Sequence, residues 1–176
     1  MPKSLCYVVG YPGSGKTTAV AGAMPAGPRA AIAKPFAHIR YDRGVVQLGA
    51  SRDIYSGTDA LALNVQPQVV QWLNQTTDVP VVIGEGDRLG NAKFFAAAQT
   101  AGWGLTVIHV DVPELVSRHR AWQRGSRFDD RWFAGRVTKV NRLTRAFADH
   151  CVTLDGTQSR RDVTRKLREI LAFERL

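Results

Sequence analysis

Cysteine is scarce in this sequence: its 176 residues include only Cys6 and Cys151, and neither lies in a C-x-x-C spacing. Two cysteines cannot form the disulfide framework of a small secreted protein, so we expect both to be reduced and the protein to be cytoplasmic. Histidine is also rare and scattered, at positions 38, 109, 119 and 150. We therefore expect no protein-bound zinc.

Long hydrophobic runs are also missing. No stretch approaches the roughly 20 apolar residues that a membrane span requires, and Leu5–Val9 is too short for the apolar region of a signal peptide. Internal repeats and long linkers are absent as well. With 44% hydrophobic and 22% charged residues, the sequence predicts one globular domain over residues 1–176.

Acidic residues are outnumbered, 15 against 24 lysines and arginines, which gives a net charge of +9. The excess is concentrated in residues 118–145, where two acidic residues accompany nine basic ones: Arg118, Arg120, Arg124, Arg127, Arg131, Arg136, Lys139, Arg142 and Arg145. A positive segment of this kind suits a phosphate-rich partner, either a nucleotide or a nucleic acid. A basic helix that simply faces solvent would show the same composition.

Short apolar runs alternate with helical patterns along the chain. We expect strands at residues 5–9, 36–41, 79–83, 105–110 and 151–154, with 45–48 as an extension or hairpin partner of the second. Helices are expected at 15–24, 67–75, 91–100, 113–149 with a break near 125–130, and 160–173. This alternation predicts an α/β fold, a three-layer sandwich around a five-stranded, mainly parallel sheet.

The segment Gly10-Tyr-Pro-Gly-Ser-Gly-Lys-Thr17 matches G-x-x-x-x-G-K-[ST], the phosphate-binding P-loop, between a strand and a helix. Backbone amides and the helix N-terminus of such a loop surround phosphate groups. We expect Lys16 to contact the β- and γ-phosphates of ATP and Thr17 to bind Mg²⁺. The residues expected to hold the nucleotide are Gly10, Tyr11, Pro12, Gly13, Ser14, Gly15, Lys16, Thr17 and Thr18.

The sequence lacks the N-K-x-D motif of GTPases, and the third expected strand runs into Val81-Val-Ile-Gly-Glu-Gly-Asp-Arg88. A short chain with an arginine-rich segment after its fourth strand resembles the nucleotide-kinase-like branch of P-loop phosphotransferases. The resemblance implies a P-loop nucleoside triphosphate hydrolase-like kinase fold with a lid at about 118–145. It also implies that lid arginines contact the transferred phosphoryl group, and Arg124 and Arg127 border the expected break. The aromatic residues between the lid arginines either pack beneath the lid or stack on a base.

A kinase needs a group that orients the acceptor hydroxyl. His38-Ile-Arg-Tyr-Asp-Arg43 ends the second expected strand, and its aspartate resembles the strand-end aspartate of polynucleotide-kinase-like enzymes. That resemblance implies that Asp42 is the general base, beside the P-loop, with Arg40 or Arg43 near an acceptor phosphate. The alternative is an Asp-Arg-Gly turn between two short strands.

Glu85 and Asp87 follow the third expected strand, and either carboxylate suits Mg²⁺. Arg88 is similar to the arginine of the Asp-Arg or Glu-Arg pair in thymidylate and deoxynucleoside kinases, which implies a contact with the acceptor. Gly86 leaves open which carboxylate is equivalent to the acidic member of that pair. A loop with both carboxylates facing water is the alternative.

Two further positions are assigned by analogy with such kinases. Ser56-Gly-Thr-Asp59 lies where these kinases build the acceptor pocket, so Asp59 is a candidate for substrate contact or for a helix N-cap. Asp155-Gly-Thr157 follows the last expected strand, where related enzymes hold adenine, and Gly156 is the candidate there.

The function has three candidates, which differ in the acceptor of the phosphoryl group or in having none. Gly44–Gly49, Tyr55–Leu61 and Gly84–Leu89 resemble a group of phage-type P-loop kinases, which implies phosphorylation of the hydroxymethyl group of hydroxymethyluracil in phage DNA, in the host cytoplasm. The first alternative is a small-molecule kinase acting on a nucleoside, nucleotide or sugar acid. The second is a nucleic-acid-binding NTPase that transfers no phosphate.

Overall fold

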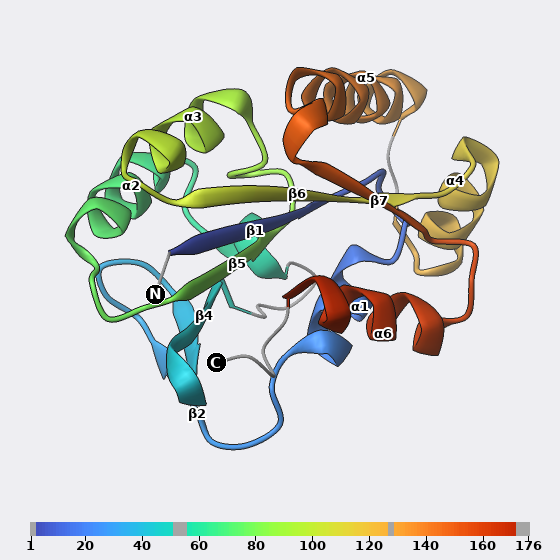
Figure 1. Cartoon of the computed structure of the whole chain (residues 1–176). Helices are drawn as coiled ribbons and strands as arrows, with labels where there is room; N and C mark the ends of the chain where they lie inside the picture. Colours follow the sequence, from blue (N-terminus) through green and yellow to red (C-terminus); the bar gives the residue numbers. More distant parts are fainter. Residues whose placement is uncertain (1–2, 51–55, 127–128, 172–176) are drawn as a thin grey trace.

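The computed structural model describes residues 3–50, 56–126 and 129–171 (Figure 1). Within them, seven strands form one sheet in the order β2-β3-β4-β5-β1-β6-β7. The strands are β1 (Ser4–Val9), β2 (Arg29–Ile32), β3 (His38–Tyr41), β4 (Val45–Leu48), β5 (Val81–Glu85), β6 (Gly104–Asp111) and β7 (Cys151–Asp155).

Six α-helices and three short 3₁₀ helices connect these strands in the described residues. The α-helices are α1 (Lys16–Ala23), α2 (Gln66–Gln75), α3 (Ala92–Thr100), α4 (Glu114–Gln123), α5 (Asp130–Ala146) and α6 (Arg160–Leu171). The 3₁₀ helices are η1 (Asp42–Gly44), η2 (Gly57–Ala60) and η3 (Ala148–His150). The predicted break in the lid region is confirmed, since α4 ends at Gln123 and α5 begins at Asp130.

The sheet is covered on both faces, as the sequence predicts. Alternate residues of β1 point to opposite sides, because side chains alternate along a strand. Leu5, Tyr7 and Val9 pack with the buried residues of α2 and α3. Cys6 and Val8 pack with those of α1 and α6. In Figure 1, α2, α3 and α5 accordingly lie above the sheet and α1 and α6 below it.

Five strands are parallel, and an antiparallel hairpin extends one edge. β4, β5, β1, β6 and β7 pair in parallel, whereas β3 pairs antiparallel with both β2 and β4. The prediction of five strands is therefore two short, while the alternative of 45–48 as a hairpin partner is confirmed. β2 escaped prediction because its sequence, Arg-Ala-Ala-Ile, has little β propensity and lies mostly exposed at the edge.

Because β3 and β4 form an antiparallel hairpin, Asp42 lies at the edge of the sheet opposite to the expected one. Val45, at the start of β4, pairs with Val81 at the start of β5, and Ser4 at the start of β1 pairs with the same residue. Asp42 precedes β4 and therefore lies at the amino edge of the parallel strands. The P-loop follows β1 at the carboxyl edge, so the prediction that Asp42 lies beside the P-loop is wrong.

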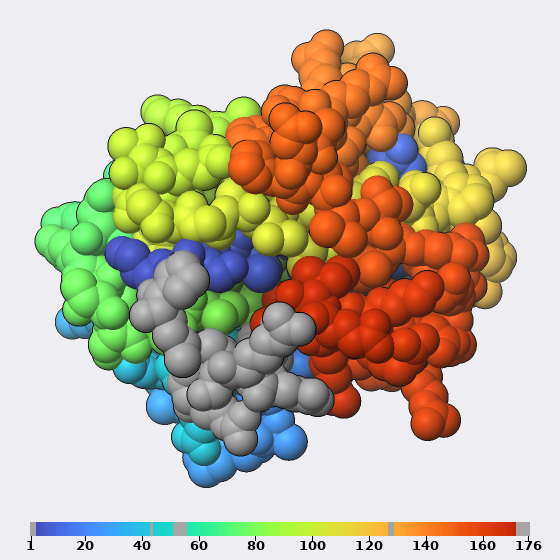
Figure 2. All heavy atoms as spheres, viewed as in Figure 1, coloured from blue at the N-terminus to red at the C-terminus, as the bar shows by residue number. Residues whose placement is uncertain are grey.

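Helices of the C-terminal half form a large part of one face of the molecule. Figure 2 shows α5 and α6 on either side of β7 in this view. No helix in the described part of the chain is both long and apolar enough to cross a membrane.

Candidate active site

The P-loop joins β1 directly to α1, and two of its glycines are required by their surroundings. Gly10 and Gly13 have positive φ angles of 156° and 95°. A Cβ on Gly13 would lie 2.1 Å from the backbone oxygen of Ser117 in α4. The hydroxyl of Ser117 also donates to the carbonyl of Pro12 at 2.8 Å, so α4 is packed directly against the loop.

Lys16 begins α1, and its ammonium group is directed back over the loop. Its Nζ donates to the carbonyl oxygens of Gly10 and Tyr11 at 2.9 and 3.0 Å. Burial lowers the pKa of Lys16, while the nearby carboxylates of Glu85 and Asp59 act in the opposite direction. Within the described atoms, the buried hydroxyl of Ser14 has no hydrogen-bond partner. The loop thus holds a charge and a hydroxyl that anionic oxygens would satisfy.

Three side-chain oxygens converge beside the P-loop. Thr17 Oγ1 donates to Glu85 Oε1 at 3.0 Å and lies 3.1 Å from Ser56 Oγ, which is 3.4 Å from the same carboxylate oxygen. Glu85 is only 3% exposed, and this burial raises its pKa, although Lys16 and Thr17 oppose the rise. The carboxylate that faces Thr17 is therefore Glu85.

These oxygens fit Mg²⁺, which prefers hard oxygen ligands and usually binds through one or two carboxylates together with substrate phosphates and water. The described residues contain no cluster of three or more His, Cys, Asp or Glu side chains able to hold a metal ion by themselves. A shared site with the phosphates of ATP therefore suits this chain better than an all-protein metal site. The contribution of Ser56 was not predicted, since a lone serine in a loop carries no sequence signal for metal binding.

Asp59 lies on η2, and its carboxylate organises the loop after β5. Its Oδ1 accepts hydrogen bonds from the backbone amides of Asp87 and Arg88 at 2.8 and 2.9 Å. Arg88 returns a bond of 3.3 Å from its guanidinium to the carbonyl of Asp59. Asp59 does not cap η2, whose N-cap is Ser56 without a side-chain hydrogen bond.

Tyr7 connects η2 to the end of β5 through the hydrogen bonds of its hydroxyl group. Its side chain is fully buried, and its hydroxyl lies 2.8 Å from Thr58 Oγ1 and 3.1 Å from the carbonyl of Gly86. Thr58 in turn donates to the carbonyl of Glu85 at 2.9 Å. Burial raises the pKa of Tyr7 well above its usual value, so the hydroxyl stays protonated. The sequence gives no sign of this role, because a tyrosine within an apolar strand simply indicates core.

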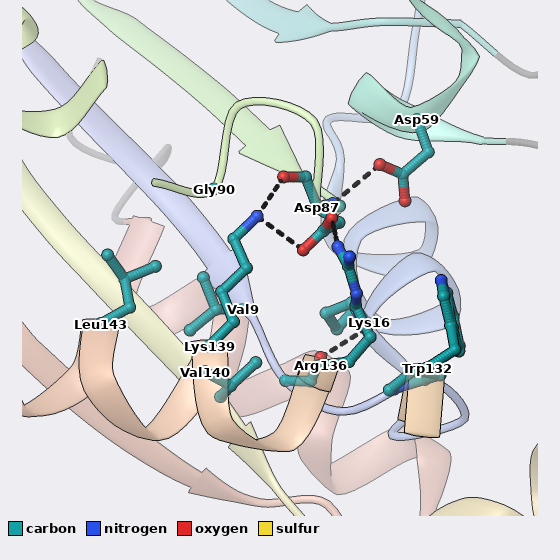
Figure 3. A pocket seen from close by; sticks show the side chains of 13 residues that line it. Val9, Lys16, Asp59, Asp87, Gly90, Trp132, Arg136, Lys139, Val140 and Leu143 are labelled. Carbon is teal, nitrogen blue, oxygen red and sulfur yellow. Dashed lines mark hydrogen bonds and ion pairs between the residues drawn. The ribbon is translucent and has the colours of Figure 1, made fainter. Parts of the chain in front are cut away.

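Asp87 pairs with α5 rather than with Thr17. Its carboxylate forms ion pairs with Arg136 and with Lys139, the latter at 2.7 Å, and Lys139 also donates to its backbone carbonyl at 2.8 Å. Figure 3 shows both cationic side chains reaching from α5 to Asp87. Although both cations belong to the predicted lid segment, the basic composition alone did not distinguish them from the arginines around them.

A cavity of about 130 Å³ lies between the P-loop, the loop after β5 and α5 (Figure 3). Lys16, Asp59 and Asp87 line it, and α5 contributes Trp132, Arg136, Lys139, Val140 and Leu143. The structure therefore brings five predicted site residues to the same cavity: Gly10, Pro12, Lys16, Asp59 and Asp87. A hydroxyl-bearing molecule placed here would lie beside the P-loop lysine.

A second cavity of about 170 Å³ lies at the start of α1. Thr18 and Gly156, both predicted to hold the nucleotide, line it together with Arg120. Arg120 donates to the carbonyl of Gly156 at 2.9 Å, which joins α4 to the loop after β7. Both cavities thus have residues of the P-loop in their walls.

The remaining predicted residues lie apart from these cavities or outside the description. Arg40 forms an ion pair of 2.6 Å with Asp78 near the start of β5, at the same edge as Asp42. Arg43 is in η1 at that edge, and its side chain is not described. Arg124 is the C-cap residue of α4 and is exposed, and its charge contributes to lowering the pKa of Lys16. Arg127 lies outside the described residues.

A P-loop after the first strand, with a buried glutamate facing its threonine, defines a P-loop nucleotide-binding protein. The chain belongs to the family described as P-loop Nucleotide Kinase3, whose family model matches residues 1–172. It is accordingly a phosphotransferase with a hydroxyl acceptor. A comparison with curated protein sequences finds no match.

Solved structures confirm the fold. A sugar kinase from Janibacter sp. HTCC2649 is 12% identical, with a TM-score of 0.54 and coverage of 97% of this chain and 95% of the other. A gluconokinase from Sinorhizobium meliloti 1021 is 17% identical, with a TM-score of 0.51 and coverage of 98% and 97%. At these identities the likeness shows the shared architecture only.

Proposed function

We propose that this kinase transfers the γ-phosphoryl group of ATP to a hydroxyl of a small molecule, a nucleoside, nucleotide or sugar acid, held in the cavity between the P-loop and α5. The observation that carries the proposal is that Lys16 and Asp59 line this one cavity. A cation for the phosphates and a carboxylate for the acceptor proton are the two groups that such a transfer requires.

Each of the two cavities is assigned one substrate, the acceptor in the first and ATP in the second. The adenine of ATP occupies the cavity formed by Thr18, Arg120 and Gly156, and its phosphates extend across the P-loop amides toward Lys16. Thr17, Ser56 and Glu85 would hold Mg²⁺, which neutralises phosphate charge when bound. Phosphate oxygens replace the Gly10 and Tyr11 carbonyls as partners of the Lys16 ammonium group.

Asp59 orients the acceptor hydroxyl and takes its proton. The oxygen lone pair of the hydroxyl forms a bond to the γ-phosphorus, and the bond from that phosphorus to the bridging oxygen breaks, leaving its electron pair on ADP. The hydroxyl proton passes to the Asp59 carboxylate. Two backbone amides bind Oδ1 of this carboxylate and so fix its direction.

Arg124, and Arg127 as predicted from the sequence, supply positive charge to the transferring group from the segment between α4 and α5. Arg124 lies within electrostatic range of Lys16. Positive charge placed beside the phosphates would stabilise the charge that develops on the transferring group.

A second candidate acceptor is the hydroxymethyl group of hydroxymethyluracil in DNA. One observation favours it: an open groove of about 530 Å³ runs between the start of α3 and α5, and it shares Gly90, Lys139 and Leu143 with the acceptor cavity. Arg142 also lines this groove. A substrate longer than a mononucleotide fits such a continuation, and the net charge of +9 suits a polyanion.

The test is label transfer from ATP carrying a radioactive γ-phosphate, with nucleosides, nucleotides, sugar acids, normal DNA and hydroxymethylated DNA supplied separately. The proposal predicts label in a small-molecule pool. Label only in hydroxymethylated DNA would establish the second candidate instead. Release of inorganic phosphate with no labelled acceptor would identify an NTPase and contradict both.

A further inference from the structure

One helix, α5, contacts both the P-loop and the loop after β5. Arg136 and Lys139 bind the carboxylate of Asp87, and Lys139 also donates to the backbone carbonyl of Asp87 at 2.8 Å. Two residues after Lys139, the side-chain oxygen of Asn141 accepts a hydrogen bond of 2.9 Å from the hydroxyl of Tyr11 in the P-loop. The helix therefore joins the loop proposed to hold the phosphoryl donor to a loop that lines the proposed acceptor cavity.

Tyr11 takes part in the P-loop through its backbone and contacts the rest of the protein through its side chain. Its carbonyl oxygen accepts hydrogen bonds of 3.0 Å from the Lys16 ammonium group and from the backbone amide of Ser14. Its ring lies against the ring of His109 in β6, with the centroids 6.3 Å apart and the planes at 65°. The side chain of Tyr11 thus links α5 and β6 to the backbone that holds Lys16.

Such a link matters for phosphoryl transfer because the two reacting atoms belong to different molecules, each held by a different loop. Efficient reaction requires these atoms to be about 3–3.5 Å apart, and a displacement of about 1 Å can cost about 100-fold in rate. In the described structure, neither Tyr11 nor Asn141 lines the acceptor cavity or the cavity at the start of α1. Their hydrogen bond therefore affects the alignment of the two loops rather than direct contact with a substrate.

We infer that Asn141 is a positioning residue for phosphoryl transfer, which acts through Tyr11 and fixes the P-loop relative to the acceptor cavity. The inference rests on the proposed function and concerns the same site. Loss of the hydrogen bond leaves the P-loop amides and Lys16 in place to bind ATP, but it releases the P-loop from α5. We therefore expect this loss to lower kcat while the KM for ATP stays nearly constant.

The test compares the wild type with Asn141→Leu, Tyr11→Phe, the double variant and Asn141→Asp. Leucine removes the acceptor of the bond and phenylalanine removes its donor, whereas aspartate keeps an acceptor oxygen. Tyr41→Phe is the matched control, because the Tyr41 hydroxyl also donates to a side-chain amide oxygen, that of Gln47 at 2.8 Å, but within the β3–β4 hairpin. Melting temperatures of the variants establish that each is folded.

ATP labelled at the γ-phosphate is supplied with nucleosides, nucleotides, sugar acids, normal DNA and hydroxymethylated DNA in turn, and the kinetics are measured with the acceptor that the wild type labels. Asn141→Leu and Tyr11→Phe should each lower kcat about 10- to 100-fold and change the KM for ATP less than about threefold. The double variant should match either single variant, because all three lose the same bond. Asn141→Asp and Tyr41→Phe should keep kcat within about twofold of the wild type.

An unchanged kcat in Asn141→Leu would overturn the inference and leave the kinase assignment standing. Losses that multiply in the double variant would also overturn it, as would a kcat of Asn141→Asp as low as that of Asn141→Leu. Absence of label from every acceptor with the wild type would instead contradict the proposed function, and the inference would fall with it.

Discussion

Thr17 and Glu85 are 68 residues apart in the sequence and share a hydrogen bond of 3.0 Å. Parallel pairing of β1 with β5 places the ends of both strands at the same edge of the sheet, where Val8 pairs with Glu85. The P-loop hydroxyl and the strand-end carboxylate meet for this reason. Since both oxygens suit Mg²⁺, we expect this edge to bind the phosphate end of ATP.

Glu85→Gln should stabilise the fold at neutral pH and reduce kcat about 100-fold or more. Burial raises the pKa of Glu85, so the folded protein favours the protonated form of this side chain more than the unfolded chain does. The contribution of Glu85 to stability is thus complete below its ordinary pKa near 4.5 and is lost as pH rises through the raised value. Glutamine keeps the hydrogen-bond acceptor without the charge.

Melting temperatures at pH 4 and pH 7.5 test this. The variant should melt a few degrees above the wild type at pH 7.5 and at about the same temperature at pH 4. Glu114→Gln is the control, because that carboxylate lies on the surface in an i,i+4 pair with Arg118 and should have little effect at either pH. A Glu85→Gln protein that melts below the wild type at pH 7.5 would refute the account of this carboxylate.

Asp59→Asn should lower kcat about 100-fold or more, because asparagine cannot accept the hydroxyl proton. The amide oxygen of asparagine can still accept from the backbone of Asp87 and Arg88, so the loop should keep its shape. Asp42→Asn is the control at the opposite edge of the sheet and should keep full turnover. Steady-state kinetics of both variants measure kcat. A large loss of kcat in Asp42→Asn with none in Asp59→Asn would assign the role of general base to Asp42 instead of Asp59.

Gly13→Ala should weaken ATP binding at least about tenfold, since the loop must deform by a strain of about 1–3 kcal/mol. The new Cβ would meet the backbone of Ser117 at 2.1 Å in a residue with φ of 95°. Gly135→Ala is the control within α5, where a Cβ meets nothing within 4 Å. Alanine there should stabilise the helix by about 0.5–1 kcal/mol. Calorimetric titration with ATP and urea unfolding measure the two effects, and unchanged ATP affinity of Gly13→Ala would contradict the packing argument.

Local sequence patterns were sufficient for the P-loop and for the alternation of strands and helices. The residues proposed to bind phosphate lie within one segment, Gly10–Thr17, so their spacing along the chain already determines their geometry. The apolar strands β1, β5 and β6 were equally visible, because central parallel strands are buried on both faces.

Strand direction could not be read from the sequence, and the error at Asp42 follows from that. An apolar run at 36–41 is equally compatible with a parallel or an antiparallel strand, and the direction decides at which edge Asp42 lies. The ion pairs of Asp87 with Arg136 and Lys139 could not be predicted either, because they also depend on the tertiary arrangement. Residues 49 and 52 positions apart meet only through the packing of α5 over the loop after β5.

Phosphoryl transfer measured in parallel for the wild type and Lys16→Ala tests the central claim most directly. Both proteins are incubated with ATP labelled at the γ-phosphate and with the acceptor panel, and their melting temperatures are compared. The account predicts a labelled acceptor with the wild type and a loss of at least about 100-fold with Lys16→Ala, whose fold should be intact. Equal transfer by a folded Lys16→Ala protein would contradict it.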